Sequence, residues 1–174
     1  MQQAIHFING QWVAGEGSPI TSVDPTKNQT FWRGQAASAT QVDSALNAAR
    51  AALPQWSAKT VEERLSLIKK FAELLGENKQ QLAALIAQET GKPLWETATE
   101  IGAMIGKIAI SEKAYFERTG TVENPMPVGK AFIRHKPHGV VAVFGPYNFP
   151  GHLPNGHIVP ALIAEMGAVY PELV

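Results

Sequence analysis

The chain has 174 residues, no cysteine, and 15 Lys and Arg residues balanced by 15 Asp and Glu residues, so its formal net charge is zero. This balance argues against a nucleic-acid or anionic-membrane binder, because no excess of positive charge is available to neutralise phosphates. The lack of cysteine excludes disulfides, thiolate metal sites and a cysteine nucleophile within these residues.

Neither a signal peptide nor a membrane-spanning helix is predicted. Residues 1–10 contain no basic region and no long apolar run. The longest uncharged stretch, residues 137–164, is interrupted by five prolines and four glycines, which prevent a spanning helix. We therefore expect a cytoplasmic protein with no membrane and no nucleic-acid partner.

Short strands and turns are predicted over the first forty residues. Asn9-Gly10 lies between Phe7-Ile8 and Gln11-Trp12-Val13, and both turn residues accept the positive φ of a type I′ hairpin turn. Asp24-Pro25 marks a second turn, and residues 30–32 predict a short strand.

A helical period begins at Thr40, after which apolar residues recur every three or four positions. This first stripe comprises Val42, Leu46, Ala49 and Leu53. Thr60 and Glu63 match a capping box, in which each side chain satisfies a free backbone N–H, so a second helix is expected to begin there. Its expected inward face comprises Leu65, Ile68, Phe71, Ala72 and Leu75.

Two further helices are predicted before residue 120. The pattern from Asn78 to Gln81 indicates another helix start, and Gly91 and Pro93 supply stop signals. A long helix is then expected from Leu94 to about Arg118. Its expected inward residues are Trp95, Ala98, Ile101, Ile105, Ile108 and Tyr115.

The last third of the sequence predicts the start of a sheet. Residues 131–135 alternate like an exposed strand, whereas residues 140–144 are apolar throughout and predict a strand buried on both faces of a parallel sheet. A further helix is expected from near His157. The order of hairpin, helices and one buried strand predicts the front part of an α/β fold with an incomplete sheet.

The densest chemical signal is the loop at residues 144–150, at the carboxyl end of the predicted buried strand, where open α/β sheets bind their ligands. Pro146 and Pro150 stiffen this loop around one polar amide, Asn148, which has an aromatic residue on each side. From the residues alone, a turn role for Asn148 is the simpler interpretation, and catalysis is the alternative.

No metal site is predicted from the histidines. His152 and His157 are five residues apart, which departs from the i, i+4 spacing that places two ligands on one helix face. His135 and His138 flank Pro137, so they do not share a helix. We interpret all four as solvated or capping residues.

Taken together, these segments resemble the amino-terminal part of the aldehyde dehydrogenase superfamily. This chain has Tyr147 where the family usually has Trp. Tyr147 together with residues 151–159 is similar to the N-succinylglutamate 5-semialdehyde dehydrogenases of arginine catabolism. The residues that carry the resemblance are Ile8-Asn9-Gly10-Gln11-Trp12, Asp24-Pro25, Glu89-Thr90-Gly91-Lys92-Pro93, Pro137-His138-Gly139-Val140-Val141, Pro146-Tyr147-Asn148-Phe149-Pro150 and Pro160-Ala161-Leu162.

The resemblance implies NAD-dependent oxidation of a small aldehyde by a homo-oligomer, through a cysteine thiolate and an acidic base. Residues 1–174 would be part of the NAD-binding domain, with residues of about 121–136 in the oligomerisation strands. Asn148 matches the oxyanion-hole asparagine of the family. The residues that would line the nicotinamide side of the cofactor cleft are Phe144, Pro146 and Tyr147.

The sequence departs from the family pattern after Ala164, where an Ala-Gly-Asn segment and a later Lys-Pro-Ser-Glu are usual. Residues 165–174 lack that lysine, and the chain holds neither the glycine-containing cofactor loop, the base nor the cysteine. We therefore expect this chain to be inactive alone and, with an unpaired strand edge, poorly soluble. The alternatives are a non-catalytic fragment that binds full-length subunits, or a fragment of another aldehyde dehydrogenase subfamily.

Overall fold

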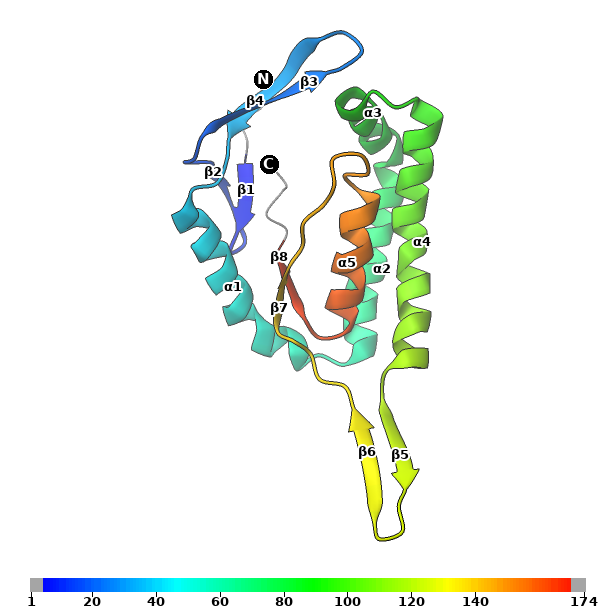
Figure 1. Cartoon of the computed structure of the whole chain (residues 1–174). Coiled ribbons are helices and arrows are strands. Elements are labelled where there is room, and N and C mark those ends of the chain that lie inside the picture. The colour runs from blue at the N-terminus through cyan, green and yellow to red at the C-terminus, as the bar shows by residue number, and fades with distance from the viewer. Residues whose placement is uncertain (1–4, 170–174) are drawn as a thin grey trace.

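The computed structural model describes residues 5–169, in which two parallel strands lie between helices (Figure 1). Strands β7 and β8 pair in parallel between α1 and α5, and α2 and α4 pack behind α5. The elements are β1 (Ile5–Ile8), β2 (Gln11–Ala14), β3 (Pro19–Asp24), β4 (Gln29–Gln35), α1 (Ala39–Ser57), α2 (Val61–Glu77), α3 (Lys79–Thr90), α4 (Leu94–Arg118), β5 (Thr121–Pro125), β6 (Lys130–Arg134), β7 (Val140–Ala142), α5 (His152–Ile163) and β8 (Gly167–Val169). Within this described part, no helix is both long and apolar enough to cross a membrane.

The first hairpin forms as the sequence predicts. Strands β1 and β2 pair antiparallel, with Ile8 opposite Gln11 at the turn. Asn9 and Gly10 have φ values of 51° and 76°, the positive values that a type I′ turn requires. The expected turn and strand that follow are also present, in the β3–β4 hairpin.

The turn of the β3–β4 hairpin is organised by Asp24, whose side chain is only 3% exposed. Its Oδ1 accepts hydrogen bonds from the backbone N–H and the hydroxyl of Thr26, at 2.9 and 2.6 Å, and from the backbone N–H of Lys27. The Thr26 hydroxyl is the main cause that holds the pKa of Asp24 below its ordinary value of 3.8, and burial opposes it. The turn is therefore built around an ionised carboxylate.

Replacing Asp24 with Asn is expected to destabilise the chain at neutral pH. Because the folded-state pKa is lowered, the ionised carboxylate stabilises the fold above about pH 3.8 and stops doing so as the pH falls through the lowered value. The urea midpoints of the two proteins should therefore differ at neutral pH and converge in acid. A gap that persists unchanged in acid, or that Asp43→Asn on the exposed side of α1 reproduces, would contradict this account.

Helices α1 and α2 begin at side-chain capping boxes. The predicted capping box at Thr60 and Glu63 is confirmed, with the Thr60 N–H donating to Glu63 Oε2 at 2.7 Å. A second box, Ser38 with Gln41, starts α1 at Ala39 and was not predicted. The helix start expected at Asn78 is confirmed, because α3 begins at Lys79 with Asn78 as its N-cap residue; the Asn78 side chain donates to the Leu74 carbonyl and does not cap α3.

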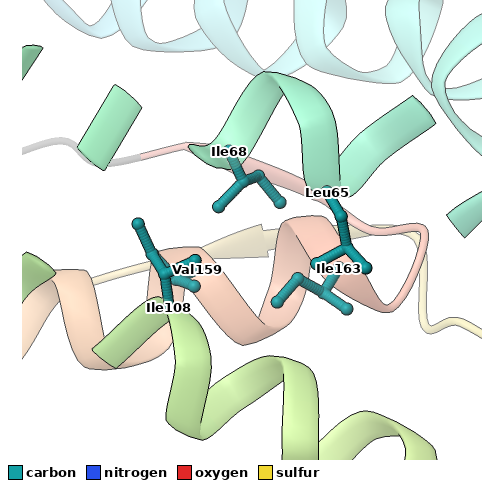
Figure 2. Close-up of a cluster of buried hydrophobic side chains, with 5 residues drawn as sticks. All are labelled: Leu65, Ile68, Ile108, Val159 and Ile163. Atoms are coloured by element: carbon teal, nitrogen blue, oxygen red, sulfur yellow. The ribbon is translucent and has the colours of Figure 1, made fainter. Parts of the chain in front are cut away.

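The core lies where α2, α4 and α5 meet. Figure 2 shows this cluster, in which side chains from all three helices face one another. A second cluster joins α2, α3 and α4. The first comprises Leu65, Ile68, Ile108, Val159 and Ile163, and the second Leu75, Ala83 and Ile101.

Most of the predicted helix faces are confirmed, with three exceptions. The predicted bounds of α4, Leu94 to Arg118, agree with the structure. Trp95 was expected to face inward, but it is 72% exposed because it lies in the first turn of α4, beyond the end of the core. Phe71, on the margin of the α2 stripe, and Val42, near the start of α1, are also exposed.

The central sheet differs from the prediction in three ways. The strand expected at residues 140–144 is shorter, since β7 ends at Ala142; Val140 and Val141 are only half-buried, and Phe144 is exposed. The sheet also has a second parallel strand, β8, which was not predicted. Helix α5 begins at His152 rather than near His157, because its first turn contains the helix-compatible Pro154.

The end of α5 is fixed by side chains from α1 and α2. Arg64, which is 1% exposed, donates from Nε to the Ile163 carbonyl at 3.1 Å and from Nη1 to the Lys59 carbonyl. Its Nη2 forms an ion pair with Glu165 at 3.2 Å. These contacts turn the chain from α5 into β8.

The β5–β6 hairpin projects away from the helices (Figure 1). The exposed strand predicted at residues 131–135 is confirmed as β6, whereas its partner β5 was not predicted. An ion pair between Lys130 and Glu123 joins the two strands at 2.6 Å. The large apolar side chains exposed on this hairpin are Val122, Met126, Val128, Phe132 and Ile133.

Candidate functional site

The loop from Val143 to Pro150 leads from the carboxyl end of β7 to α5. Val143 is buried and anchors the start of the loop, while Phe144 is 71% exposed and Tyr147 is 92% exposed. Asn148 is exposed and Pro146 is half-buried. All four residues singled out from the sequence thus lie on one loop, and two aromatic rings and one amide are open to solvent.

One attachment of the loop runs through Phe149 to the segment just before α4. The Nζ atom of Lys92 lies 3.4 Å from the centre of the Phe149 ring, which is a cation–π contact. Lys92 is mostly buried and is held in turn by an ion pair with Glu96 at 3.1 Å. The residue next to Asn148 is therefore fixed to Lys92, which lies two residues before α4 and is paired with Glu96 in its first turn.

A second attachment follows at Glu100 of α4, whose side chain is 5% exposed. Its Oε1 accepts hydrogen bonds from the backbone N–H groups of Gly151 and His152, each at 3.0 Å. A carboxylate at this place also interacts favourably with the positive end of the α5 dipole. Glu100 Oε2 and His152 Nδ1 are buried, and neither has a hydrogen-bond partner among the described residues.

Close contact between α4 and the end of the loop depends on Gly151. A Cβ at this residue would lie 2.7 Å from the Sδ atom of Met104, so a side chain here would push Met104 aside. One turn into α5, the Asn155 side chain donates to the Met104 carbonyl at 3.1 Å. Glycine at 151 thus lets the loop approach α4 closely enough for Glu100 to reach the backbone.

Sequence reasoning missed both contacts, that of Lys92 before α4 and that of Glu100 within it. Lys92 was read only as part of a motif, and Glu100 was not singled out. The usable signal was a charged residue, Glu100, on the inward face of a helix next to Ile101. The histidine interpretation was also incomplete, since His152 is half-buried with a buried Nδ1 atom rather than solvated.

The loop is better suited to contact the planar ring of a nucleotide than to bind the phosphate groups of the same ligand. Exposed Phe144 and Tyr147 offer aromatic faces at the carboxyl end of a parallel strand, where α/β folds bind nucleotides. The N-terminus of α5 is already occupied by the Glu100 carboxylate, which would repel a phosphate. Over residues 5–169, no three His, Asp or Glu side chains form a cluster that could hold a metal ion.

Comparison with known proteins identifies the family. The model of the aldehyde dehydrogenase family matches residues 12–170, so the chain belongs to this family. The fold is that of the amino-terminal part of these enzymes, as the sequence predicts, and the resemblance at the level of the superfamily is confirmed.

Solved structures agree with this assignment. The NAD-dependent benzaldehyde dehydrogenase of Corynebacterium glutamicum matches with a TM-score of 0.87 and 28% identity, over 98% of this chain and 38% of its own. The NADP-dependent glyceraldehyde-3-phosphate dehydrogenase of Bacillus halodurans C-125 matches with a TM-score of 0.89 and 26% identity, over 98% of this chain and 37% of its own. The succinate-semialdehyde dehydrogenase of Burkholderia pseudomallei matches with a TM-score of 0.88 and 27% identity, over 97% of this chain and 35% of its own. The chain therefore spans little more than a third of the structures that it matches.

Proposed function

We propose that this chain forms the amino-terminal part of a cytoplasmic, NAD-dependent aldehyde dehydrogenase that oxidises N-succinylglutamate 5-semialdehyde. The observation that carries the proposal is the exposed amide of Asn148 on a stiff loop after β7, in a chain of this family. Solved relatives that use NAD or NADP support a nicotinamide cofactor. The choice of NAD and of the substrate rests on Tyr147 and residues 151–159.

In the proposed mechanism, the side-chain N–H of Asn148 donates a hydrogen bond to the aldehyde oxygen as negative charge develops on it. Donors that are already in position stabilise such charge well, because they need no reorganisation during the reaction. Phe144, Pro146 and Tyr147 would hold the nicotinamide ring and exclude water from it. The nicotinamide, when bound, supplies the hydride acceptor.

The chain alone is expected to show no aldehyde-dependent reduction of NAD or NADP. The family chemistry requires a cysteine thiolate, and these 174 residues contain none. Absorbance at the reduced-nicotinamide band, with N-succinylglutamate 5-semialdehyde, succinate semialdehyde and benzaldehyde as substrates, measures this. Turnover that co-purifies with the chain through repeated purification would contradict the prediction.

A hybrid dehydrogenase tests the proposed function directly. It joins residues 1–163 of this chain to the cofactor- and cysteine-bearing remainder of an N-succinylglutamate 5-semialdehyde dehydrogenase. A second hybrid carries the corresponding remainder of the C. glutamicum benzaldehyde dehydrogenase. Activity in the first and not in the second supports the proposed subfamily, and the reverse contradicts it.

A second candidate function is a non-catalytic fragment that associates with full-length subunits. The apolar side chains exposed on the β5–β6 hairpin favour it, because an exposed apolar strand pair is a surface that another chain can cover. Residues 121–136 would then act as oligomerisation strands, as they would in the complete homo-oligomer. Co-purification with the complete enzyme, lost on replacement of Phe132 and Ile133 by Thr, would support this function.

A further inference from the structure

We propose that the amino-terminal end of α4 and the segment just before it position the oxyanion amide, with Lys92 before the helix and Glu100 within it as two clamps that hold the loop of Asn148. This inference deepens the proposed function and rests on it, because a positioning role has meaning only if Asn148 contacts the reacting oxygen. Neither residue would touch the substrate or the cofactor. Each acts through backbone or ring atoms that follow Asn148 directly in the chain.

The first clamp, Lys92, acts on the ring of Phe149. A buried ammonium group 3.4 Å from the ring centre restrains the side chain next to Asn148. Cation–π contacts strengthen when the cation is removed from water, and the Nζ atom of Lys92 is buried. The ion pair with Glu96 fixes the ammonium group in place.

The second clamp, Glu100, acts on the backbone. Its two hydrogen bonds, at 3.0 Å each, hold the N–H groups of Gly151 and His152, which follow Asn148 by three and four residues. Charged acceptors make hydrogen bonds about twice as strong as neutral ones. The loop end is therefore fixed to α4 by a stronger contact than an ordinary helix cap.

The two clamps lie at the amino-terminal end of α4. Glu96 and Glu100 are spaced four residues apart on one face of the helix, and Lys92, two residues before α4 begins, reaches this face through its ion pair with Glu96. The two clamps contact the chain immediately after Asn148, while Val143 is buried immediately before the exposed part of the loop. The amide is thus held from both sides of the loop.

The simpler interpretation is that Glu100 only stabilises α5. Under that interpretation, removal of Glu100 lowers stability and leaves the kinetics of folded enzyme unchanged. Under the positioning proposal, it lowers kcat of the folded enzyme with little change in KM, since only the transition state uses the oriented amide. The two interpretations therefore differ in a kinetic measurement.

The experiment compares Glu100→Ala, Glu100→Gln and Lys92→Met in the first hybrid, with Glu112→Ala as the matched control. Glu112 lies on the same helix and forms a surface ion pair with Lys69, away from the loop. We expect Glu100→Ala and Lys92→Met each to lower kcat roughly tenfold to a hundredfold, because a catalytic group misplaced by about 1 Å can cost 10²-fold. Glu100→Gln keeps an oxygen that accepts from both N–H groups, and it should restore most of kcat.

Hydrogen exchange in the 174-residue chain adds a measurement without catalysis. Glu100→Ala should speed exchange at Gly151 and His152 more than Glu112→Ala does, and Glu100→Gln should not. If the amides exchange freely even in the unsubstituted chain, the kcat comparison decides. The proposal is overturned if Glu100→Ala and Lys92→Met lower kcat no more than Glu112→Ala, or if Glu100→Gln fails to restore it.

Failure of this proposal can be distinguished from failure of the proposed function. If Asn148→Ala lowers kcat and the two clamp variants do not, Asn148 is catalytic and α4 does not position it. If Asn148→Ala leaves kcat unchanged, the oxyanion role itself is wrong, and the positioning proposal fails with it. Should Glu100→Ala not fold, Lys92→Met and Glu100→Gln still give a kinetic result.

Discussion

Replacement of Asn148 by Ala in the first hybrid is expected to lower kcat by about 10²–10³-fold, the usual effect of removing one oxyanion-hole donor. KM should change little, because the hydrogen bond strengthens only as charge develops on the aldehyde oxygen. Asn148 is exposed, so its loss removes no core contact and should leave the melting temperature unchanged. Steady-state kinetics and a thermal melt of the same preparation measure both effects.

Two further substitutions make this test specific. Asn148→Asp keeps the size of the side chain but replaces the donor with a carboxylate, so kcat should fall at least as far as in the alanine variant. Asn47→Ala, on the exposed side of α1, is the matched control and should leave kcat unchanged. A kcat for Asn148→Ala within the range of the Asn47 control would contradict the oxyanion role.

Features that depend on neighbouring residues could be predicted from the sequence. The Asn9-Gly10 turn and the Thr60–Glu63 capping box are local hydrogen-bonded structures, and both are confirmed. The bounds of α4 follow from an apolar period with a stop signal before it at Gly91, which adopts the left-handed conformation with φ of 74°. The Ser38–Gln41 box has the same local pattern and was available to the same reasoning.

Features that join distant segments could not be predicted in this way. Glu100 contacts Gly151 across 51 positions of the chain, and no local pattern indicates that pairing. The strand at residues 140–144 was expected to be buried on both faces because it is apolar throughout. Apolar composition alone, however, does not say how many neighbouring elements cover a strand. In the structure β7 has β8 as its one neighbour among the described strands, and Phe144 remains exposed.

The position of the loop could be predicted on firmer grounds than the role of any residue within it. Its position after a parallel strand follows from the general placement of ligands in α/β folds, and the structure has the loop at that place. The neighbours that hold it are Lys92 and Glu100, and Glu100 precedes its partner Gly151 by 51 residues. Sequence reasoning therefore located the candidate site but not the residues that support it.

Replacement of Arg64 by Met is expected to lower the free energy of unfolding by roughly 3 kcal/mol or more, since hydrogen bonds from charged donors contribute about 1.5–3 kcal/mol each. Methionine fills much of the same volume, so the loss reports the missing donors more than a cavity. Urea denaturation of the 174-residue chain measures the change. Arg50→Met, on the exposed face of α1, is the control and should change stability little.

The size of this effect follows from how α5 ends. The last four carbonyl groups of a helix lack partners within it, and an unpaired buried carbonyl is costly. Here the Pro160 and Ala161 carbonyls accept from backbone N–H groups that follow the helix, and the Leu162 carbonyl accepts from Trp56 Nε1. The fourth, the Ile163 carbonyl, depends on Arg64.

The guanidinium group of Arg64 contributes more than charge. It reaches the Ile163 and Lys59 carbonyls and the Glu165 carboxylate at once, which a single ammonium group cannot match in geometry. Arg64→Lys should therefore recover only part of the stability lost in Arg64→Met. Because Glu165 is partly exposed, Glu165→Gln should cost less than about 1 kcal/mol. A Glu165→Gln loss equal to that of Arg64→Met would show instead that the ion pair, and not the carbonyl contacts, stabilises the turn into β8.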